Sequence, residues 1–199
     1  MNYFTKCIKH FKLVSKHKWY VFKTACEAGI PIRGFMHDMS KFSPIEFFNS
    51  AKYYTGDRSP IDNEKDDKGY SYAWLHHRGH NPHHWEYWID NLSDGGVPLK
   101  MPYKFVKEMI CDWIGSGKAY EGKNWTKESP INFFMKRYEK GQIKMHRDTA
   151  NICIQILERY RNPNRSIASC FAEYNEHVYT YFYHESETAF TSFGTYPEK

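Results

Sequence analysis

The sequence predicts an all-α protein, and three observations lead to that prediction. Apolar residues recur at three- and four-residue steps, which is the period of one face of a helix. Proline and glycine separate these stretches at the places where helices begin and end. The loose alternation typical of strands is confined to the tail, over residues 177–184 and 189–193.

The first helix is predicted over residues 3–28, and Gly29 followed by Pro31 gives its stop signal. One stripe of this helix is formed by His10, Val14, His17 and Val21. Because these residues share a face with apolar neighbours, we expect His17 to point inward, as a metal ligand must.

A short helix is expected over residues 31–39. The next helix begins with Ser43 as its N-cap and Pro44 at its first position, has Glu46 three residues after the cap, and ends near Tyr54. The junction between these two helices therefore carries three polar side chains of interest: His37, Asp38 and Lys41.

Residues 55–69 are predicted to be a loop because they are polar and contain Gly56, Pro60 and Gly69. This segment is interpreted either as an ordinary surface loop or as a mobile lid.

Five histidines follow within nine positions: His76, His77, His80, His83 and His84. A helix is predicted over residues 70–78, terminated by Gly79. Asn81 then caps another helix with Pro82 at its first position. Burial of an imidazole without a partner costs free energy, so a cluster among tryptophans and tyrosines points to metal ligation. The candidate ligands are His77 and His84 first, then His76 and His83.

A loop is expected over residues 91–100, followed by a helix from Pro102 to Gly115 that carries Asp112 among apolar residues. A buried carboxylate needs a partner. A metal ion would supply one, and a hydrogen bond from a neighbouring Trp or Tyr is the alternative.

The remaining helices are predicted over residues 129–140, 144–160 and 165–177, with His146 in a structural role. The aromatic tail is expected to form a short hairpin or an extended segment. We therefore divide the chain into a metal-binding helical domain, residues 1–160, and a C-terminal helix with an aromatic-rich tail packed on it, residues 161–199. Since 18% of the residues are aromatic, we expect rings to dominate the core.

Composition narrows the functional classes. The five cysteines include no Cys-x-x-Cys pair, which favours reduced thiols over a zinc ribbon. No run of 18 apolar residues and no signal-like N-terminus is present, so we expect a cytoplasmic protein without a membrane partner. The net charge of +5 slightly favours small anionic ligands, and it permits nucleic acid without indicating it.

The order of these residues is His17, then His37-Asp38, then the histidine cluster, then Asp112. It resembles the HD-domain superfamily, the helical metal-dependent phosphohydrolases named for a His-Asp pair. A closer resemblance is to an uncharacterised bacterial and phage family within or beside that superfamily, over roughly residues 10–145. The motifs that carry it are KHKWYV, HDMSKFSPIEF, YSYAWLHHRGHNPHHWEYW and MPYKFVKEMICDW.

The resemblance implies an HD-like helical bundle with one or two divalent ions (Mn, Fe, Zn, Co or Mg). The matching four-ligand set is His17, His37, Asp38 and Asp112. With His77 and His84 added, a two-metal site follows, in which Asp38 bridges the ions. Lys41 would bind a phosphate oxygen, and Arg33 and Arg78 are weaker candidates for the same role.

The sequence thus predicts a metal-dependent phosphohydrolase that acts on a small anionic phosphate ester or nucleotide through a metal-activated water. Lys41 and Asp38 are its predicted catalytic residues. Two alternatives stay open: a di-iron oxygenase of the inositol-oxygenase type, and a non-enzymatic, metal-stabilised binding protein.

Overall fold

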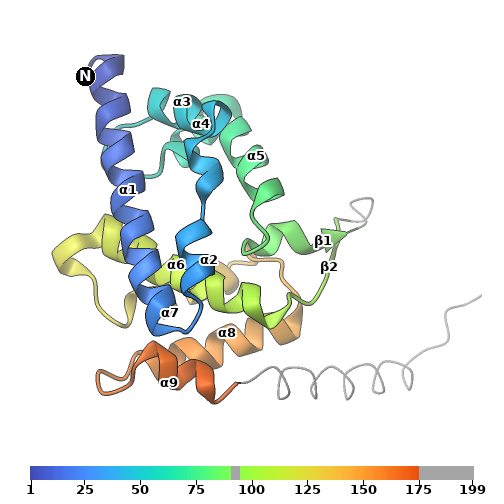
Figure 1. Cartoon of the computed structure of the whole chain (residues 1–199). Helices are drawn as coiled ribbons and strands as arrows, with labels where there is room; N and C mark the ends of the chain where they lie inside the picture. Colours follow the sequence, from blue (N-terminus) through green and yellow to red (C-terminus); the bar gives the residue numbers. More distant parts are fainter. Residues whose placement is uncertain (91–94, 175–199) are drawn as a thin grey trace, which may run out of the picture.

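The computed structural model describes residues 1–90 and 95–174, and over these residues the protein is all-α, as predicted (Figure 1). The α-helices of the first half are α1 (Tyr3–Glu27), α2 (Pro31–Met36), α3 (Pro44–Lys52), α4 (Pro60–Lys68) and α5 (Tyr72–His80). Those of the second half are α6 (Tyr103–Glu121), α7 (Ser129–Tyr138), α8 (Arg147–Tyr160) and α9 (Ile167–Ala172). Short 3-10 helices form η1 (Met39–Phe42), η2 (Trp85–Trp88) and η4 (Gly122–Asn124).

Helices α1 and α6 pack against each other and cross in the lower half of the view in Figure 1. The predicted inward stripe of α1 is confirmed, because His10, Val14, His17 and Val21 are all buried. Helix α6 continues six residues beyond Gly115, which was expected to end it. A Cβ at Gly115 would lie 2.4 Å from Val21 Cγ2 and 2.8 Å from Val21 N. This glycine therefore permits the close approach of two helices.

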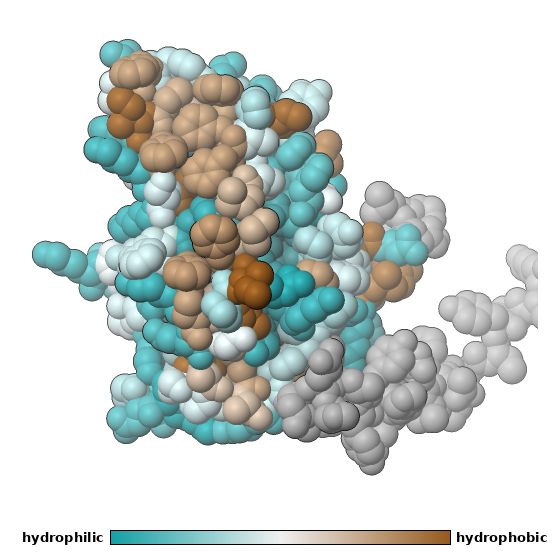
Figure 2. All heavy atoms as spheres, viewed as in Figure 1, coloured by the Kyte–Doolittle hydropathy of each residue, from teal (hydrophilic) through white to brown (hydrophobic). Residues whose placement is uncertain are grey.

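The core is mainly aliphatic, so the expectation that rings dominate it was wrong. Its largest fully buried side chains include the single aromatic Phe134 and many aliphatic ones, such as Met101, Met109, Ile110 and Ile156. Many other rings are exposed, including Phe4, Phe11 and Phe35. Figure 2 shows apolar side chains gathered on the face of the molecule that contains α1 and α2.

The loop predicted over residues 55–69 was wrong for most of its length, because residues 60–68 form α4. Pro60 occupies the first turn of this helix, and Gly69 ends it with a positive φ of 78°. Both residues are helix-boundary signals and not loop signals in these positions. Glu64 anchors α4, since its buried carboxylate accepts a hydrogen bond from Ser71 at 2.5 Å.

The histidine segment also differs from the prediction. Helix α5 passes through Gly79 and ends at His80, and Asn81 caps its C-terminal end. The Asn81 side chain donates to the carbonyl of His77 at 2.7 Å, so it does not begin a new helix. A turn and η2 follow, with His84 immediately before η2.

Three further segments of the structure can be compared with the prediction from the sequence. Within the predicted loop 91–100, Val97–Pro98 (β2) pairs antiparallel with Ile89–Asp90 (β1). Helix α9 is shorter than the predicted 165–177, and the predicted hairpin or extended tail lies outside the described residues, as does most of the unit 161–199. Among the described helices, none is both long and apolar enough to cross a membrane.

Candidate metal centre

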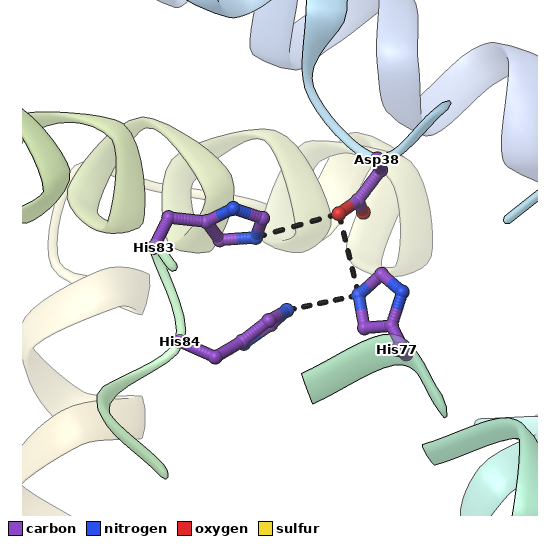
Figure 3. Close-up of side chains that lie close together, drawn as sticks. All are labelled: Asp38, His77, His83 and His84. Carbon is purple, nitrogen blue, oxygen red and sulfur yellow. Dashed lines mark hydrogen bonds and ion pairs between the residues drawn. The ribbon is translucent and has the colours of Figure 1, made fainter. Parts of the chain in front are cut away.

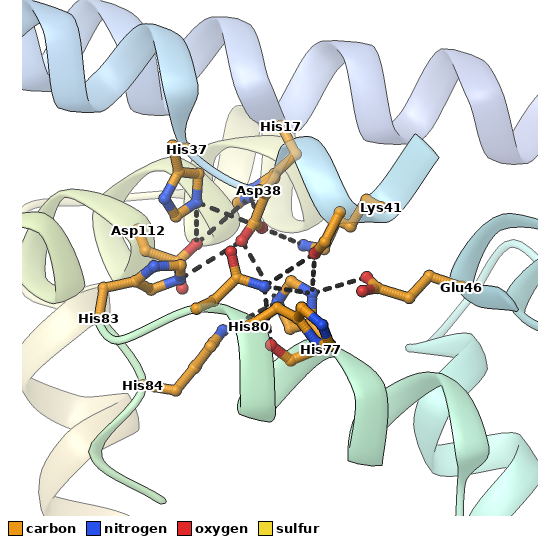
Figure 4. Close-up of polar contacts among 12 residues, drawn as sticks. His17, His37, Asp38, Lys41, Glu46, His77, His80, His83, His84 and Asp112 are labelled. Atoms are coloured by element: carbon orange, nitrogen blue, oxygen red, sulfur yellow. Dashed lines mark hydrogen bonds and ion pairs between the residues drawn. The ribbon is translucent and has the colours of Figure 1, made fainter. Parts of the chain in front are cut away.

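Asp38 lies at a strained backbone junction between α2 and η1. With a φ of 54°, it is the one non-glycine residue at positive φ in the part of the chain that the structure describes. Such strain is typical of functional positions. The ammonium of Lys18 donates to the carbonyls of His37 and Phe35, which satisfies free carbonyl groups at the end of α2. The turn places the Asp38 carboxylate, which is fully buried, between α1, α6 and the end of α5 (Figure 4).

The first ligand group consists of His17, His37, Asp38 and Asp112, which is the set that the resemblance implied. Oδ2 of Asp38 lies 3.3 Å from Nε2 of His17 and 3.2 Å from Nε2 of His37. Oδ1 of Asp112 lies 3.3 and 3.4 Å from the same two nitrogens. All four residues are buried.

The second ligand group consists of Asp38, His77, His83 and His84 (Figure 3). Here the other carboxylate oxygen takes part: Oδ1 of Asp38 lies 3.2 Å from Nε2 of His77 and 3.4 Å from Nε2 of His83. Nε2 of His84 lies 2.9 Å from Nε2 of His77. The two oxygens of Asp38 thus face two different groups.

The distances within the first group fit a tetrahedral metal site. Four ligands placed about 2.0–2.2 Å from a common ion lie roughly 3.3–3.6 Å from one another. The four nitrogen–oxygen distances above, from 3.2 to 3.4 Å, match this spacing. Among the described residues, the buried polar atoms without a hydrogen bond include three that face the groups: His37 Nε2, His83 Nε2 and Asp38 Oδ1. These atoms have neighbours but no hydrogen bond of proper geometry, as expected of atoms that ligate an ion.

The Nδ1 atoms of most ligand rings also have a polar partner; Figure 4 shows that of His77, which is Glu46. Nδ1 of His77 lies 2.7 Å from Glu46 Oε2, and Nδ1 of His17 lies 3.3 Å from Ser116 Oγ. Glu108 Oε1 lies 3.2 Å from Nδ1 of His37. Acceptors at Nδ1 keep that proton in place and leave the lone pair on Nε2 for a metal.

Seven of the eight predicted ligands therefore belong to one of the two groups. His76 does not, because its Nδ1 lies 2.6 Å from Glu46 Oε1 and its ring is partly exposed. Sequence reasoning missed Glu108 and saw Glu46 only as a cap residue. The spacing of Glu108, four positions before Asp112, was the available signal, since residues four apart share a helix face.

The surroundings of the ligand histidines lower the pKa of some and raise the pKa of others. Burial and the Lys41 ammonium lower the pKa of His17 to about 4, and burial with His83 holds the pKa of His84 well below its usual value. Burial acts the same way on His37 and His77, but the Asp38 carboxylate outweighs it and raises the pKa of both. Each group thus contains one histidine whose pKa is raised.

Lys41, the predicted phosphate contact, lies beside the first group. Its Nζ is 2.6 Å from Asp38 Oδ2, and its side chain is 26% exposed. Burial opposes the charge of Lys41, but Asp38 and Asp112 outweigh that effect and raise its pKa. Of the weaker candidates, Arg33 is bound to Glu108 at 2.7 Å, whereas Arg78 is not among the residues that line the cavity beside the two groups.

A cavity of about 590 Å³ opens onto both groups. Its wall includes ligands from each group, His17 and Asp112 from the first and His77 and His84 from the second. Two cationic side chains besides Lys41, Lys65 and Arg137, line it as well. The wall also contains aromatic side chains: Trp74, Trp85, Trp113, Tyr120 and Phe133. Carboxylates line it too, among them Asp62, Glu86 and Glu121. A small anionic molecule with an apolar part therefore matches the part of the cavity next to Lys41 and the ligand groups.

Comparison with known proteins places the chain in a family. The model of a family of unknown function (DUF5662) matches residues 6–159, which contain every residue of both ligand groups. No curated protein matches the chain, and no solved structure does.

Proposed function

We propose that this chain, which belongs to the family of unknown function DUF5662, is a metal-dependent phosphohydrolase of the HD type. One observation supports the proposal above all others. Two buried ligand groups share Asp38, each through a different carboxylate oxygen, and both border one cavity. Cations paired about 3.5–4 Å apart are used by many enzymes that cleave phosphate esters.

The donor atoms suit divalent cations such as Mn²⁺, Fe²⁺, Co²⁺ or Zn²⁺, because they combine imidazole nitrogens with carboxylate oxygens. The first group would hold one cation through His17, His37, Asp38 and Asp112. The second group would hold another through Asp38, His77, His83 and His84. Bound cations supply Lewis acidity toward phosphoryl oxygens and lower the pKa of a coordinated water from 15.7 to about 7.

The chain's own residues provide the rest of the chemistry. Lys41 lines the cavity next to Asp38, where its ammonium can bind a phosphoryl oxygen and stabilise charge that develops on it. Lys65 and Arg137 add positive charge farther along the wall. Trp74 and Trp85 offer flat apolar surface for the remainder of the substrate and exclude water from it.

The proposal is tested by elemental analysis of the purified protein and a screen of phosphate esters with Mn²⁺, Co²⁺, Mg²⁺ and Zn²⁺. We expect tightly bound metal and metal-dependent phosphate release. His37→Ala should lose the ion of the first group together with phosphate release, whereas His80→Gln should keep both ions and the activity, since His80 is exposed and outside both groups. Phosphate release that persists with full metal loss would reject the proposal.

The second ligand group favours one alternative, because three imidazoles with one carboxylate also suit iron. In that case the protein would be a di-iron oxygenase. Iron in the purified protein together with substrate-dependent oxygen consumption, and no phosphate release with any metal, would select it. A metal-stabilised binding protein would retain its metal without either activity.

A further inference from the structure

Glu108 contacts ligands of both groups, although it belongs to neither. It lies on α6, four residues before Asp112, and its side chain is buried. Oε1 lies 3.2 Å from Nδ1 of His37, a ligand of the first group. The same oxygen lies 3.3 Å from Nδ1 of His83, a ligand of the second group. The two rings are also packed together, with centroids 4.3 Å apart.

The other outer contacts are confined to one group each. Ser116 Oγ lies 3.3 Å from Nδ1 of His17 and donates to Asp112 at 3.2 Å, both in the first group. Glu46 reaches only His77 among the ligands, which belongs to the second group. Within the described residues, Glu108 is therefore the one outer carboxylate shared between the two groups.

Glu108, His37 and His83 also lie close enough together to hold a cation of their own. The surroundings of Glu108 argue against that use. Its second oxygen, Oε2, forms an ion pair with Arg33 at 2.7 Å, and the guanidinium of Arg33 rests 4.4 Å from the centre of the Phe105 ring. A cation on Glu108 would stand next to this fixed positive charge and would also compete for the carboxylate.

We propose that Glu108 is a positioning residue that orients one histidine of each ligand group and so couples the two metal sites. Resting on the two-metal centre proposed above, this assignment extends it to a residue outside the coordination shell. By accepting the Nδ1 protons of His37 and His83, Glu108 holds the Nε2 lone pairs of both rings toward Asp38. Arg33 keeps the carboxylate in place.

The test is a titration of the metal-free full-length protein with Co²⁺, followed by calorimetry and by the visible absorption of the bound ion. The variant Glu108→Gln keeps the size of the side chain and removes its charge. We expect both binding steps to weaken, each by roughly 10–100-fold. The absorption of both bound ions should shift, whereas a purely structural role would change thermal unfolding alone.

Matched variants separate a shared role from a local one. Ser116→Ala should weaken only the step assigned to the first group, and Glu46→Gln only the step assigned to the second. Arg33→Met leaves Glu108 intact but unanchored, so it should weaken both steps by less than Glu108→Gln. It also serves as the second variant if Glu108→Gln does not fold.

Three results would overturn the proposal. The first is a change in only one binding step in both Glu108→Gln and Arg33→Met. The second is a wild-type protein that binds three Co²⁺ ions and loses one in Glu108→Gln without change in the other two, since Glu108 would then be a ligand. The third is a wild-type protein that binds fewer than two. Activity is not part of this test, so a failure to find phosphate release would affect only the proposed reaction.

Discussion

The two ligand groups on either side of Asp38 are built in different ways. The first draws its other ligands from α1, from the end of α2 and from α6, so they span positions 17 to 112. The second takes all three histidines from positions 77 to 84, at the end of α5 and the turn after it. One group therefore depends on the packing of distant helices, and the other on one short segment.

This difference has a structural consequence. The first group lies where α1 and α6 cross, so its geometry is tied to the packing of the core. The second group is held by hydrogen bonds around α5: Nδ1 of His77 donates to Glu46 on α3, and the side chain of Asn81 donates to the carbonyl of His77. We therefore expect changes in the core to affect the first group and changes near α5 to affect the second.

The largest effect is expected from Asp38→Asn, because Asp38 is the one residue common to both groups. Asparagine tolerates the left-handed backbone but lacks the charge. Both ions should be lost, and hydrolysis should fall to background, as measured by elemental analysis and phosphate release. Asp66→Asn, at an exposed ion pair, is the control. Retention of one ion at full affinity would show that the two groups do not share Asp38.

A variant that lacks a single ligand should lose one of the two ions and keep the other. His17→Gln should remove the first ion and leave the second, whereas His77→Gln should do the reverse, because each ring serves one group. Counting bound Co²⁺ ions in each variant measures this. Loss of both ions in either variant, with the fold intact by circular dichroism, would contradict the division into two sites.

Lys41→Met should slow the reaction without weakening the binding of the metal ions. We expect kcat for phosphate release to fall by roughly 10²–10³-fold, the usual cost of removing one group that stabilises developing charge. The first ion should bind at least as tightly as before, since the ammonium no longer pairs with Asp38 Oδ2. The exposed Lys12→Met is the control. An unchanged kcat would assign Lys41 to structure alone.

Substitutions at two glycines test whether the first ligand group depends on core packing more than the second does. Gly115→Ala places a methyl group against Val21, so it should cost about 1–3 kcal/mol of stability and weaken the first ion more than the second. Gly79→Ala, on the helix that carries His77, meets no atom within 4 Å and should stabilise the protein by about 0.5–1 kcal/mol. Thermal unfolding and Co²⁺ titration measure both. If Gly115→Ala weakened the binding of both ions equally, the first group would depend on core packing no more than the second does.

The pKa shifts of the ligand histidines predict that the affinity for the metal ions depends on pH. His37 and His77 have a raised pKa, so each stays protonated to higher pH than an ordinary histidine, and binding of an ion must displace that proton. His17, with its pKa lowered to about 4, is already neutral. The affinity for the metal should therefore rise as pH increases, until both rings are neutral. Calorimetry in buffers of different ionisation enthalpy measures the released protons, and affinity independent of pH would contradict this assignment.

The inward face of α1 and the caps of α3 could be predicted because they depend on local periodicity and local cap chemistry. The same local signals at Pro60 and Gly69 were misread, since a polar helix held by the buried Glu64 lacks an apolar stripe. The end of α6 was also misplaced at Gly115. The role of that glycine depends on contact with Val21, far away in sequence, which local patterns do not encode.

The candidate ligands could be found from residue type and order. Which of them belong to each ligand group could not be predicted in this way. His76 and His77 are neighbours in sequence, yet the direction of each ring depends on the rotation of α5 against α3 and Glu46. The choice between His76 and His83 was therefore decided by packing. Glu108 was missed because a glutamate on a helix has no distinguishing mark until its histidine partners are brought next to it.

The central claim is that Asp38 stands between two cation sites, and anomalous X-ray diffraction from crystals grown with Mn²⁺ or Co²⁺ tests it most directly. We predict two peaks, one beside each carboxylate oxygen of Asp38, each about 2.0–2.2 Å from the ligand atoms of its group. The peaks should lie roughly 3.5–4 Å apart. A single peak, or peaks away from Asp38, would contradict the account.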